Sequence, residues 1–202
     1  NEIIKQGLNK KIKWTCMTRV NLVDYELLKL MKEAGCWSIH YGIESGNQRL
    51  LDNVNKGVKL QQIINAVKMA KKAGLEVVGF FMFGLPGETI ATMDETIRFS
   101  QSLDLDYAKV TLLVPFPSTP IFNELDKSGH IITKDWSKYN FHTASKVYDH
   151  PTLNWQVLEK YYSLFYRKFY FRPKYITKRF VRGLIKGTIL SDIVYMFKTF
   201  VV

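Results

Sequence analysis

Residues 77–89 read VVGFFMFGLPGET, an apolar run that passes directly into a turn with two glycines and a proline. The run from Val77 to Phe83 is short, uncharged and rich in β-branched and aromatic residues, so it predicts a strand that is buried on both faces. Glu88 to Ser102 then has the spacing of a helix. Because antiparallel strands are seldom this apolar, the stretch indicates one strand–turn–helix unit of a parallel sheet.

The same order of strand and helix recurs on both sides of this unit. Further strands are predicted over Ile12 to Thr18, Trp37 to Ile43 and Ala108 to Val114, and helices over Asp24 to Ala34, Gln48 to Asp52 and Leu60 to Ala73. Gly35 and Gly74 end two of these helices as C-caps. Repeated βα units predict a parallel sheet with right-handed crossovers. It is either an open doubly wound sheet or part of a partial barrel, because four units cannot close an eight-stranded barrel.

The pattern changes after Pro115. Pro120 to Ser128 predicts a short helix, and the aromatic residues 129–151 are irregular. Further helices are predicted over Trp155 to Phe171, Tyr175 to Lys186 and Ser191 to Val201. We therefore divide the chain into the C-terminal portion of a barrel, residues 1–130, and a basic, aromatic-rich helical extension, residues 131–202.

Composition limits the class of protein. Of the 202 residues, 47% are hydrophobic and 23% are charged, which is typical of a globular rather than a disordered chain. No apolar run is long enough to predict a transmembrane helix. Cys16 and Cys36 are too few for a disulfide framework or a structural zinc site, which favours a cytoplasmic location. Because the chain begins at Asn1 without a methionine or signal segment, we expect a piece of a longer protein.

Positive charge gathers near the C-terminus. The formal net charge is +11, and no Asp or Glu occurs between Lys160 and Leu190. The basic residues of that stretch are Lys160, Arg167, Lys168, Arg172, Lys174, Lys178, Arg179, Arg182 and Lys186. Such a tail could contact RNA, an anionic membrane surface or an acidic partner domain. A simpler interpretation is an amphipathic cap in which Tyr161, Phe165 and Phe169 pack inward at four-residue spacing.

Candidate site residues lie at the predicted strand ends. In parallel α/β folds the chemistry gathers at the carboxyl ends of the strands. Glu44 could accept hydrogen bonds from a ribose diol, or it could cap the following helix. Lys56 could pair with a ligand carboxylate, or it could be a solvated surface charge. The turn of residues 84–88 could bring backbone amides close to a flat ligand, or it could simply join a strand to a helix. His40 and residues 80–83 are expected in the core.

Taken together, these segments resemble the radical S-adenosylmethionine (SAM) superfamily over roughly residues 10 to 130. In chain order they are MTR (17–19), AGC (34–36), YGIESG (41–46), KG (56–57), KAGL (72–75), FGLPGET (83–89) and VPFPST (114–119). They look most like the cobalamin-binding subgroup, which contains methyltransferases and anaerobic oxidative-cyclase-like enzymes. The sequence FYFRP at residues 169–173 is similar to the segment after the barrel in that subgroup.

The resemblance implies a fold and a function. The chain would be α/β, part of a TIM-like partial (β/α)6 barrel with about four parallel βα units, followed by a mainly helical C-terminal extension. The family uses a 4Fe-4S cluster to cleave SAM reductively to methionine and a 5′-deoxyadenosyl radical. In this subgroup the chemistry would be cobalamin-dependent methyl transfer or oxidative cyclisation of a small-molecule substrate of unknown class.

Parts of that machinery are expected outside the chain. The family holds its cluster with three cysteines of a CxxxCxxC loop, and Cys16 and Cys36 are too far apart to replace it. The motif that holds the methionine amine and the cobalamin domain are also absent from these residues. The resemblance therefore implies no catalytic or metal-binding residue here, cluster and cobalamin sites in the N-terminal remainder of the same protein, and no activity of this chain alone.

Nine residues would contact SAM by resemblance: Arg19, Glu44, Lys56, Phe83, Gly84, Leu85, Leu113, Val114 and Pro115. Glu44 would contact the ribose, Lys56 the methionine carboxylate, and Arg19 would add a polar contact. The backbone of residues 83–85 and 113–115 would flank the adenine. Phe80 departs from relatives that have an acidic residue in that strand.

Two other functions stay open. The chain could belong to a related radical SAM enzyme that modifies tRNA, in which the basic tail touches the nucleic acid. Alternatively it could be a non-catalytic basic module whose aromatic and basic residues 155–175 bind RNA or a membrane face by stacking and phosphate contacts.

Overall fold

The structure is a computed structural model that describes residues 1–140 and 145–187. Its elements, with 3₁₀ helices written η, are α1 (Glu2–Lys5), η1 (Leu8–Lys10), β1 (Trp14–Thr18), η2 (Val20–Leu22), α2 (Tyr25–Glu33), β2 (Cys36–Glu44), α3 (Gln48–Asn53), α4 (Leu60–Lys72), β3 (Glu76–Phe83), α5 (Ile90–Ser102), β4 (Tyr107–Leu112), α6 (Pro120–Lys127), η3 (Trp136–Lys138), α7 (Trp155–Tyr170) and α8 (Pro173–Lys186). The helix expected over Ser191 to Val201 lies outside the described residues.

The chain divides into two compact units, Asn1–Tyr166 and Arg167–Val202, and each is described by itself. The boundary that the sequence predicts after residue 130 stays a prediction. Among the residues that the structure describes, no helix combines the length and the hydropathy needed to cross a bilayer.

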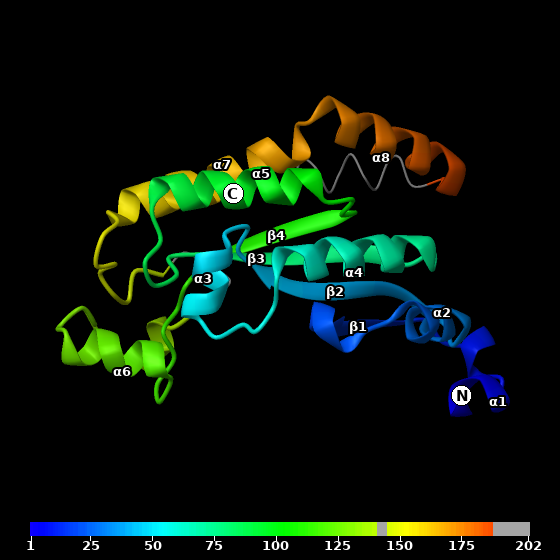
Figure 1. Cartoon of the computed structure of the whole chain (residues 1–202), viewed down its shortest axis with the longest axis horizontal. Helices are drawn as coiled ribbons and strands as arrows, with labels where there is room; N and C mark the ends of the chain where they lie inside the picture. The colour runs from blue at the N-terminus through cyan, green and yellow to red at the C-terminus, as the bar shows by residue number, and fades with distance from the viewer. Residues whose placement is uncertain (141–144, 188–202) are drawn as a thin grey trace. The chain divides into compact units, whose positions relative to one another are not determined.

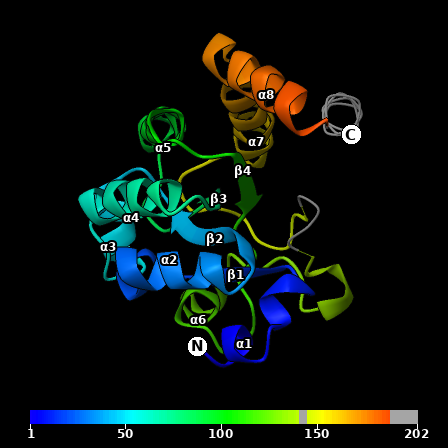
Figure 2. The same ribbon diagram turned by 90° about the vertical axis from the view of Figure 1, so that its right-hand side faces the viewer.

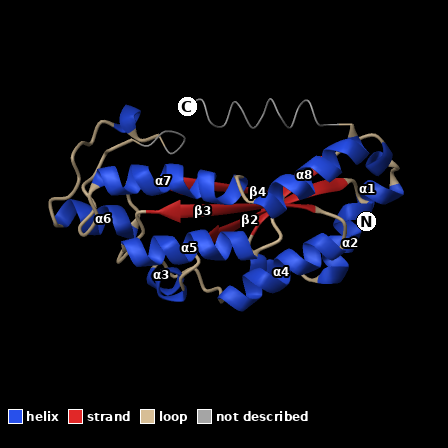
Figure 3. Cartoon of the chain, turned by 90° about the horizontal axis from the view of Figure 1, so that it is seen from above, coloured by secondary structure: helices blue, strands red, loops and turns tan. Residues whose placement is uncertain are grey.

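The four strands form one parallel sheet in the order in which they follow each other along the chain (Figure 1). Helices α2, α4 and α5 lie on the same side of this sheet (Figure 2), and α4 and α5 run alongside the strands (Figure 3). A doubly wound sheet reverses its strand order and carries helices on both faces. Sequential order with helices on one side is instead the arrangement of a segment of a (β/α) barrel. The predicted partial barrel is confirmed, and the doubly wound alternative is wrong.

Side-chain caps explain where the helices begin. Asp24 precedes α2, and its carboxylate accepts the backbone N–H of Leu27. Thr89 precedes α5, and the hydroxyl groups of Thr89 and Thr92 each accept the backbone N–H of the other residue. These caps satisfy amides that have no partner within the helix. Helix α5 therefore starts at Ile90 rather than at Glu88, and the turn before it is free to adopt its own geometry.

The core of the first unit lies between the sheet and its helices. Phe81 and Phe83 of β3 are 1% and 0% exposed. Phe165 of α7 is fully buried, and its ring centroid lies 5.2 Å from that of Phe81 and 5.9 Å from that of Phe83. Burial of these large aromatic side chains is the main favourable contribution to folding in this layer. The predicted inward face of α7 is confirmed at Phe165.

The opposite face of the sheet is only partly covered. Phe80 and Met82 alternate with the buried residues of β3 and are half-buried, as is His40 of β2. The expected burial of β3 on both faces is confirmed in its first half, where Val78 is 6% exposed. The expectation that His40 and all of residues 80–83 lie in the core is wrong, because His40, Phe80 and Met82 are only half-buried. Successive side chains of a strand point to opposite faces of the sheet. Helices α2, α4 and α5 cover only one of these faces, so side chains that point to the other face stay partly exposed.

Asp106 joins the end of α4 to the start of β3. Its side chain is 1% exposed and accepts hydrogen bonds from Lys71 Nζ at 2.6 Å and from the backbone N–H of Val77 at 2.8 Å. We predict that Asp106→Ala lowers the free energy of unfolding by about 3 kcal/mol, because the variant leaves a partly buried cation and a buried amide without their acceptor. Urea unfolding followed by circular dichroism measures the loss.

The matched control is Asp126→Ala. The Asp126 carboxylate lies 2.8 Å from Lys134 Nζ, but the two side chains are 38% and 58% exposed. An exposed ion pair stabilises a protein by less than about 1 kcal/mol. Equal losses in the two variants would contradict the role assigned to Asp106.

Candidate functional site

The strand β2 ends in an uncommon backbone conformation at Glu44. Its φ is 67°, and the pairing of β2 with β3 shifts register between Gly42 and Glu44. Few non-glycine residues adopt left-handed backbone angles, and such an irregularity turns the side chain away from its regular direction. Here Glu44 Oε1 accepts a hydrogen bond from Lys56 Nζ at 2.7 Å, and the two side chains are 22% and 18% exposed. Two predicted site residues are thus in direct contact.

Gly42 and Arg19 complete the surroundings of this ion pair. A Cβ atom on Gly42 would lie 2.7 Å from Glu44 Oε1 and 3.1 Å from Lys56 Nζ, so glycine makes room for the pair. Arg19, which follows β1, donates a hydrogen bond from its guanidinium group to the backbone carbonyl of Lys56. We call Arg19, Glu44 and Lys56 the charged cluster. In the described part of the chain, Lys56 Nζ has Glu44 Oε1 as its hydrogen-bond partner and Glu44 Oε2 has none, so both can still bind a ligand.

The turn after β3 directs its amides inward. Gly84 has φ of 89°, and the backbone N–H groups of Gly84 and Leu85 both donate to Glu88 Oε2. A Cβ atom on Gly84 would lie 2.6 Å from the hydroxyl oxygen of Tyr148. The amides of Gly84 and Leu85 are therefore not free for a ligand, because the Glu88 carboxylate binds both. The turn can still flank a flat ring by packing.

Glu88 is the buried centre of this turn. Its side chain is fully buried, and Oε1 has no hydrogen-bond partner among the described residues. Burial raises the pKa of Glu88 to about 7, although the two amide hydrogen bonds act in the opposite direction. Burial therefore outweighs the two amide hydrogen bonds, and the ionised form of Glu88 is less favoured than that of a carboxyl group in water. The sequence places Glu88 at the start of a predicted helix and does not reveal this role.

His150 and Tyr148 support the same turn from a distant segment. The backbone N–H of Leu153 donates to His150 Nδ1 at 3.0 Å, which leaves Nε2 to donate to the carbonyl of Leu85 at 3.3 Å. Tyr148 donates its hydroxyl to the carbonyl of Gly84 at 3.4 Å. Burial lowers the pKa of His150 and raises that of Tyr148, so both stay neutral near pH 7. Neither residue was predicted, because the segment that carries them has no regular periodicity.

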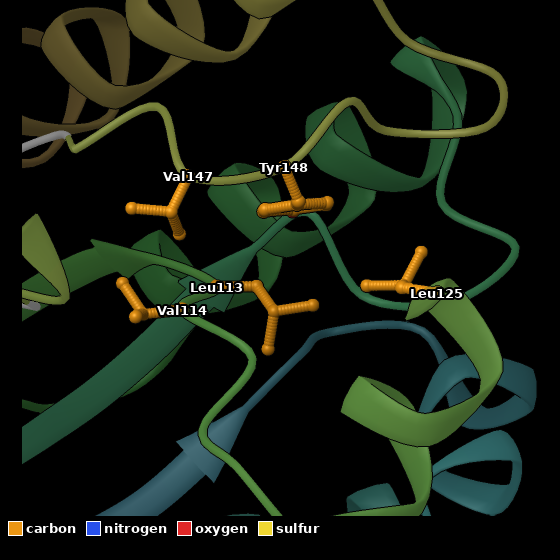
Figure 4. Close-up of a cluster of buried hydrophobic side chains, with 5 residues drawn as sticks. All are labelled: Leu113, Val114, Leu125, Val147 and Tyr148. Carbon is orange, nitrogen blue, oxygen red and sulfur yellow. The ribbon is translucent and has the colours of Figure 1, made fainter. Parts of the chain in front are cut away.

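The turn after β4 packs beside the turn after β3. The backbone N–H of Leu113 donates to the carbonyl of Phe83 at 2.8 Å. Leu113 and Val114 are buried in a small apolar cluster, and Pro115 is also buried. The cluster, drawn in Figure 4, consists of Leu113, Val114, Leu125, Val147 and Tyr148. The structure thus places residues 83–85 and 113–115 side by side, as the adenine assignment requires.

Helix α3 links the loop after β2 to the turn after β3. Arg49 donates to the carbonyl of Gly87 at 3.1 Å, and Asn53 donates to the carbonyl of Pro86 at 3.1 Å. Glu44 itself is paired across the sheet with Phe81 of β3. Since all four strands are parallel, the nine residues predicted for SAM gather at one edge of the sheet. Whether they bind SAM stays a prediction.

The described residues do not fit an iron–sulfur cluster. Among them, no three His, Cys, Asp or Glu side chains are placed to hold a metal ion. Cys16 is half-buried and Cys36 is buried, and burial raises the pKa of the Cys36 thiol. A 4Fe-4S cluster needs several thiolates, so these two residues cannot hold one.

Comparison with known proteins assigns the family. The profile of the Radical SAM superfamily matches residues 1–100. The chain belongs to the radical SAM superfamily. An uncharacterized methyltransferase of Pyrococcus horikoshii is 36% identical over 195 residues, which cover 91% of this chain and 42% of that protein. An anaerobic magnesium-protoporphyrin IX monomethyl ester cyclase of Cereibacter sphaeroides is 37% identical over 144 residues, which cover 70% of this chain and 23% of that protein.

Solved structures agree with the radical SAM fold. The radical SAM methyltransferase TsrM of Kitasatospora setae matches with a TM-score of 0.58 at 22% identity, over 63% of this chain and 26% of that chain. Coproporphyrinogen III oxidase of Escherichia coli, also a radical SAM enzyme, matches with a TM-score of 0.57 at 16% identity, over 77% of this chain and 32% of that chain. The resemblance seen in the sequence is confirmed. The chain spans less than half the length of the curated relatives quoted above, at 42% and 23%.

The buried carboxyl of Glu88 predicts a pH dependence of stability. Its pKa rises from 4.5 to about 7 on folding, so between these values the folded state binds the proton more tightly than the unfolded state. Stability from this group is therefore present below about pH 5 and is lost as pH rises through about 7. We predict that the free energy of unfolding of the wild type falls by roughly 3 kcal/mol, relative to that of Glu88→Gln, as the pH rises from about 5 to about 8.

Urea unfolding of both proteins across this pH range measures the difference, because other titrating groups cancel in it. Glu124→Gln, at an exposed position, is the matched control and should follow the wild type. Parallel stability curves for the wild type and Glu88→Gln would show that Glu88 does not titrate on unfolding as assigned.

Proposed function

We propose that this chain supplies SAM contacts and part of the substrate wall of a radical SAM enzyme that carries out cobalamin-dependent methyl transfer or oxidative cyclisation. The observation that carries the proposal is the charged cluster, which lies at the same sheet edge as the Gly84 turn. Relatives that are named as a methyltransferase and as a cyclase support these two reactions. The resemblance to the cobalamin-binding subgroup supports the use of cobalamin.

The charged cluster has the hydrogen-bonding capacity that SAM requires. An ammonium group has three donors, and Lys56 uses one of them on Glu44, so it can also bind the methionine carboxylate. The free oxygen of Glu44 can accept a hydroxyl of the ribose. Because Glu44 and Lys56 are only partly buried, the ion pair fixes both side chains without closing them off from a ligand. Arg19 orients the backbone that carries Lys56.

The turns after β3 and β4 would flank the adenine. Their side chains are mostly buried, so the ligand would meet backbone edges at residues 83–85 and 113–115. Since Glu88 binds the amides of Gly84 and Leu85, these edges offer packing against a flat ring rather than two free donors. Glu88 is thus a positioning residue for the turn.

The partly open face of the sheet would form the substrate wall. It carries Met17, which is 70% exposed, together with the half-buried His40, Phe80 and Met82. Lys109 lies on the same face, with Nζ 6.0 Å from the centroid of the Phe80 ring. Burial and the nearby Lys109 lower the pKa of His40, so its imidazole is neutral near pH 7.

The cluster and cobalamin would be held elsewhere in the same protein. In this family a 4Fe-4S cluster supplies the electron for SAM cleavage. Because Cys16 and Cys36 cannot hold such a cluster, we propose that its ligands and the cobalamin site lie in a polypeptide segment outside these 202 residues.

We predict that Glu44→Ala and Lys56→Ala each weaken SAM binding about tenfold, because each removes a charge-assisted hydrogen bond to the ligand. The measurement is equilibrium dialysis of labelled SAM against the longer protein that contains this chain, after anaerobic reconstitution. Iron content and the unfolding midpoint are recorded for every variant, so that a lost cluster or an unfolded protein is recognised.

Lys59→Ala is the control for these variants. Lys59 pairs with Asp52, but the two side chains are 66% and 51% exposed and belong to no proposed ligand contact. Its SAM affinity should equal that of the wild type. If Glu44→Ala and Lys56→Ala bind SAM as tightly as Lys59→Ala, the assignment of the charged cluster is wrong.

A second prediction concerns the chain by itself. Reconstituted anaerobically with iron and sulfide, these 202 residues should show no 4Fe-4S absorption and should form no 5′-deoxyadenosine from SAM, since they contain only two cysteines. The longer protein should do both. A stable cluster on this chain alone would refute the proposed location of the ligands.

A further inference from the structure

Helix α8 has one face of apolar side chains that are exposed. The exposed fractions are 45% for Ile176, 57% for Phe180, 48% for Val181, 59% for Leu184 and 81% for Ile185. Ile176, Phe180 and Leu184 are four residues apart and form a stripe along the helix, and Val181 and Ile185 widen it. A contiguous exposed apolar face of this kind marks an interaction site.

Helix α8 also contains five basic residues. They are Lys174, Lys178, Arg179, Arg182 and Lys186, and the sequence contains no acidic residue from 160 to 191. At 100° per residue, Arg182 is placed about 160° around the helix from Phe180 and from Leu184, and Lys178 is placed about 160° from Phe180. The helix is therefore amphipathic, with an apolar stripe on one side and positive charge on the other.

Aromatic contacts fix the start of α8 within its own unit. The guanidinium carbon of Arg172 lies 4.4 Å from the ring centroid of Phe169 and 5.8 Å from that of Tyr175. The two rings are 5.3 Å apart, and Tyr175 is buried. Because Tyr175 is held by these contacts, the direction of the stripe that begins at Ile176 is also fixed.

The chemistry of α8 favours a lipid surface over the other partners of a basic helix. Nucleic acid binds proteins through phosphate contacts and through stacking of its bases on aromatic rings. Exposed Ile, Val and Leu side chains provide neither kind of contact. An anionic bilayer surface can bind both faces of α8. The apolar stripe can insert at the boundary of the acyl chains, and the anionic headgroups attract Lys and Arg. The helix has 14 residues and so a length of about 21 Å, which is too short to span a bilayer but suits a helix lying in its surface.

We propose that α8 binds the surface of membranes that contain anionic lipids, with Ile176, Phe180 and Leu184 inserted at the acyl boundary. The complementary charge of the helix selects this occupant over a neutral bilayer. The proposal is independent of SAM chemistry, because it uses no residue of the charged cluster or of the turns.

The test is co-sedimentation of the full chain with vesicles of phosphatidylcholine alone or with about one quarter phosphatidylglycerol. The wild type should bind the anionic vesicles at least about tenfold more tightly, because each basic residue near an anionic surface strengthens binding about fivefold. Phe180→Ser combined with Leu184→Ser should weaken this binding about tenfold or more. Lys178→Gln combined with Arg182→Gln should weaken it and reduce its dependence on salt.

Ile132→Ser is the matched control, since Ile132 is 49% exposed but lies outside α8. It should bind vesicles like the wild type, and circular dichroism and unfolding midpoints confirm that every variant is folded. Equal binding by the Phe180/Leu184 variant and the control would overturn the proposal, as would a lack of preference for anionic vesicles. A dimer that dissociates in the Phe180/Leu184 variant without vesicles would make a second copy of the chain the occupant and would also overturn it.

Discussion

Parallel pairing of the four strands is the constraint on which the site depends. Since β1 to β4 run in the same direction and in sequence order, every turn from a strand into its helix lies at the same edge of the sheet. The same register places Phe81 and Phe83 toward the helices. A slip of one residue would send these aromatic side chains to the open face and would turn the Glu44 side chain away from Lys56. The core and the candidate site are therefore fixed by one set of backbone hydrogen bonds.

Local sequence was sufficient for the strands, the helices and the position of the turns. Apolar runs, helical spacing and glycines located each βα unit to within a few residues, and family resemblance selected the residues at the strand ends. Local sequence could not identify the hydrogen-bond partners that come from distant parts of the chain. The turn that Glu88 binds is also bound by Tyr148 and His150, which lie at least sixty residues away in the sequence and contact the carbonyls of Gly84 and Leu85. The amides of Gly84 and Leu85 point inward because both donate to the buried carboxylate of Glu88.

The Glu44–Lys56 pair shows a second limit of sequence reasoning. Both residues were predicted at the site, but their contact depends on a register shift in β2 and on the left-handed backbone of Glu44. Gly42 leaves room for the pair, because a Cβ atom there would lie 2.7 Å from Glu44 Oε1 and the pair would have to shift. A glycine within a strand can mark a bulge, a tight bend or a close approach of another group. The sequence alone does not distinguish these cases, whereas the strand pairing and contacts in the structure do. The cytoplasmic location and the domain boundary stay predictions, since no feature of the structure tests them.

Helices α4 and α8 show why hydrophobic periodicity alone does not determine function. Both have apolar residues at helical spacing, yet Ile63 and Val67 of α4 are each 1% exposed, whereas Phe180 and Leu184 of α8 are 57% and 59% exposed. The pattern predicts that a helix has an apolar face, but whether that face is buried depends on the elements that pack against it. In α4 the sheet covers it, so the residues contribute to folding. In α8 the described chain leaves it exposed on a helix that also contains five basic residues, so the same pattern becomes a surface for binding.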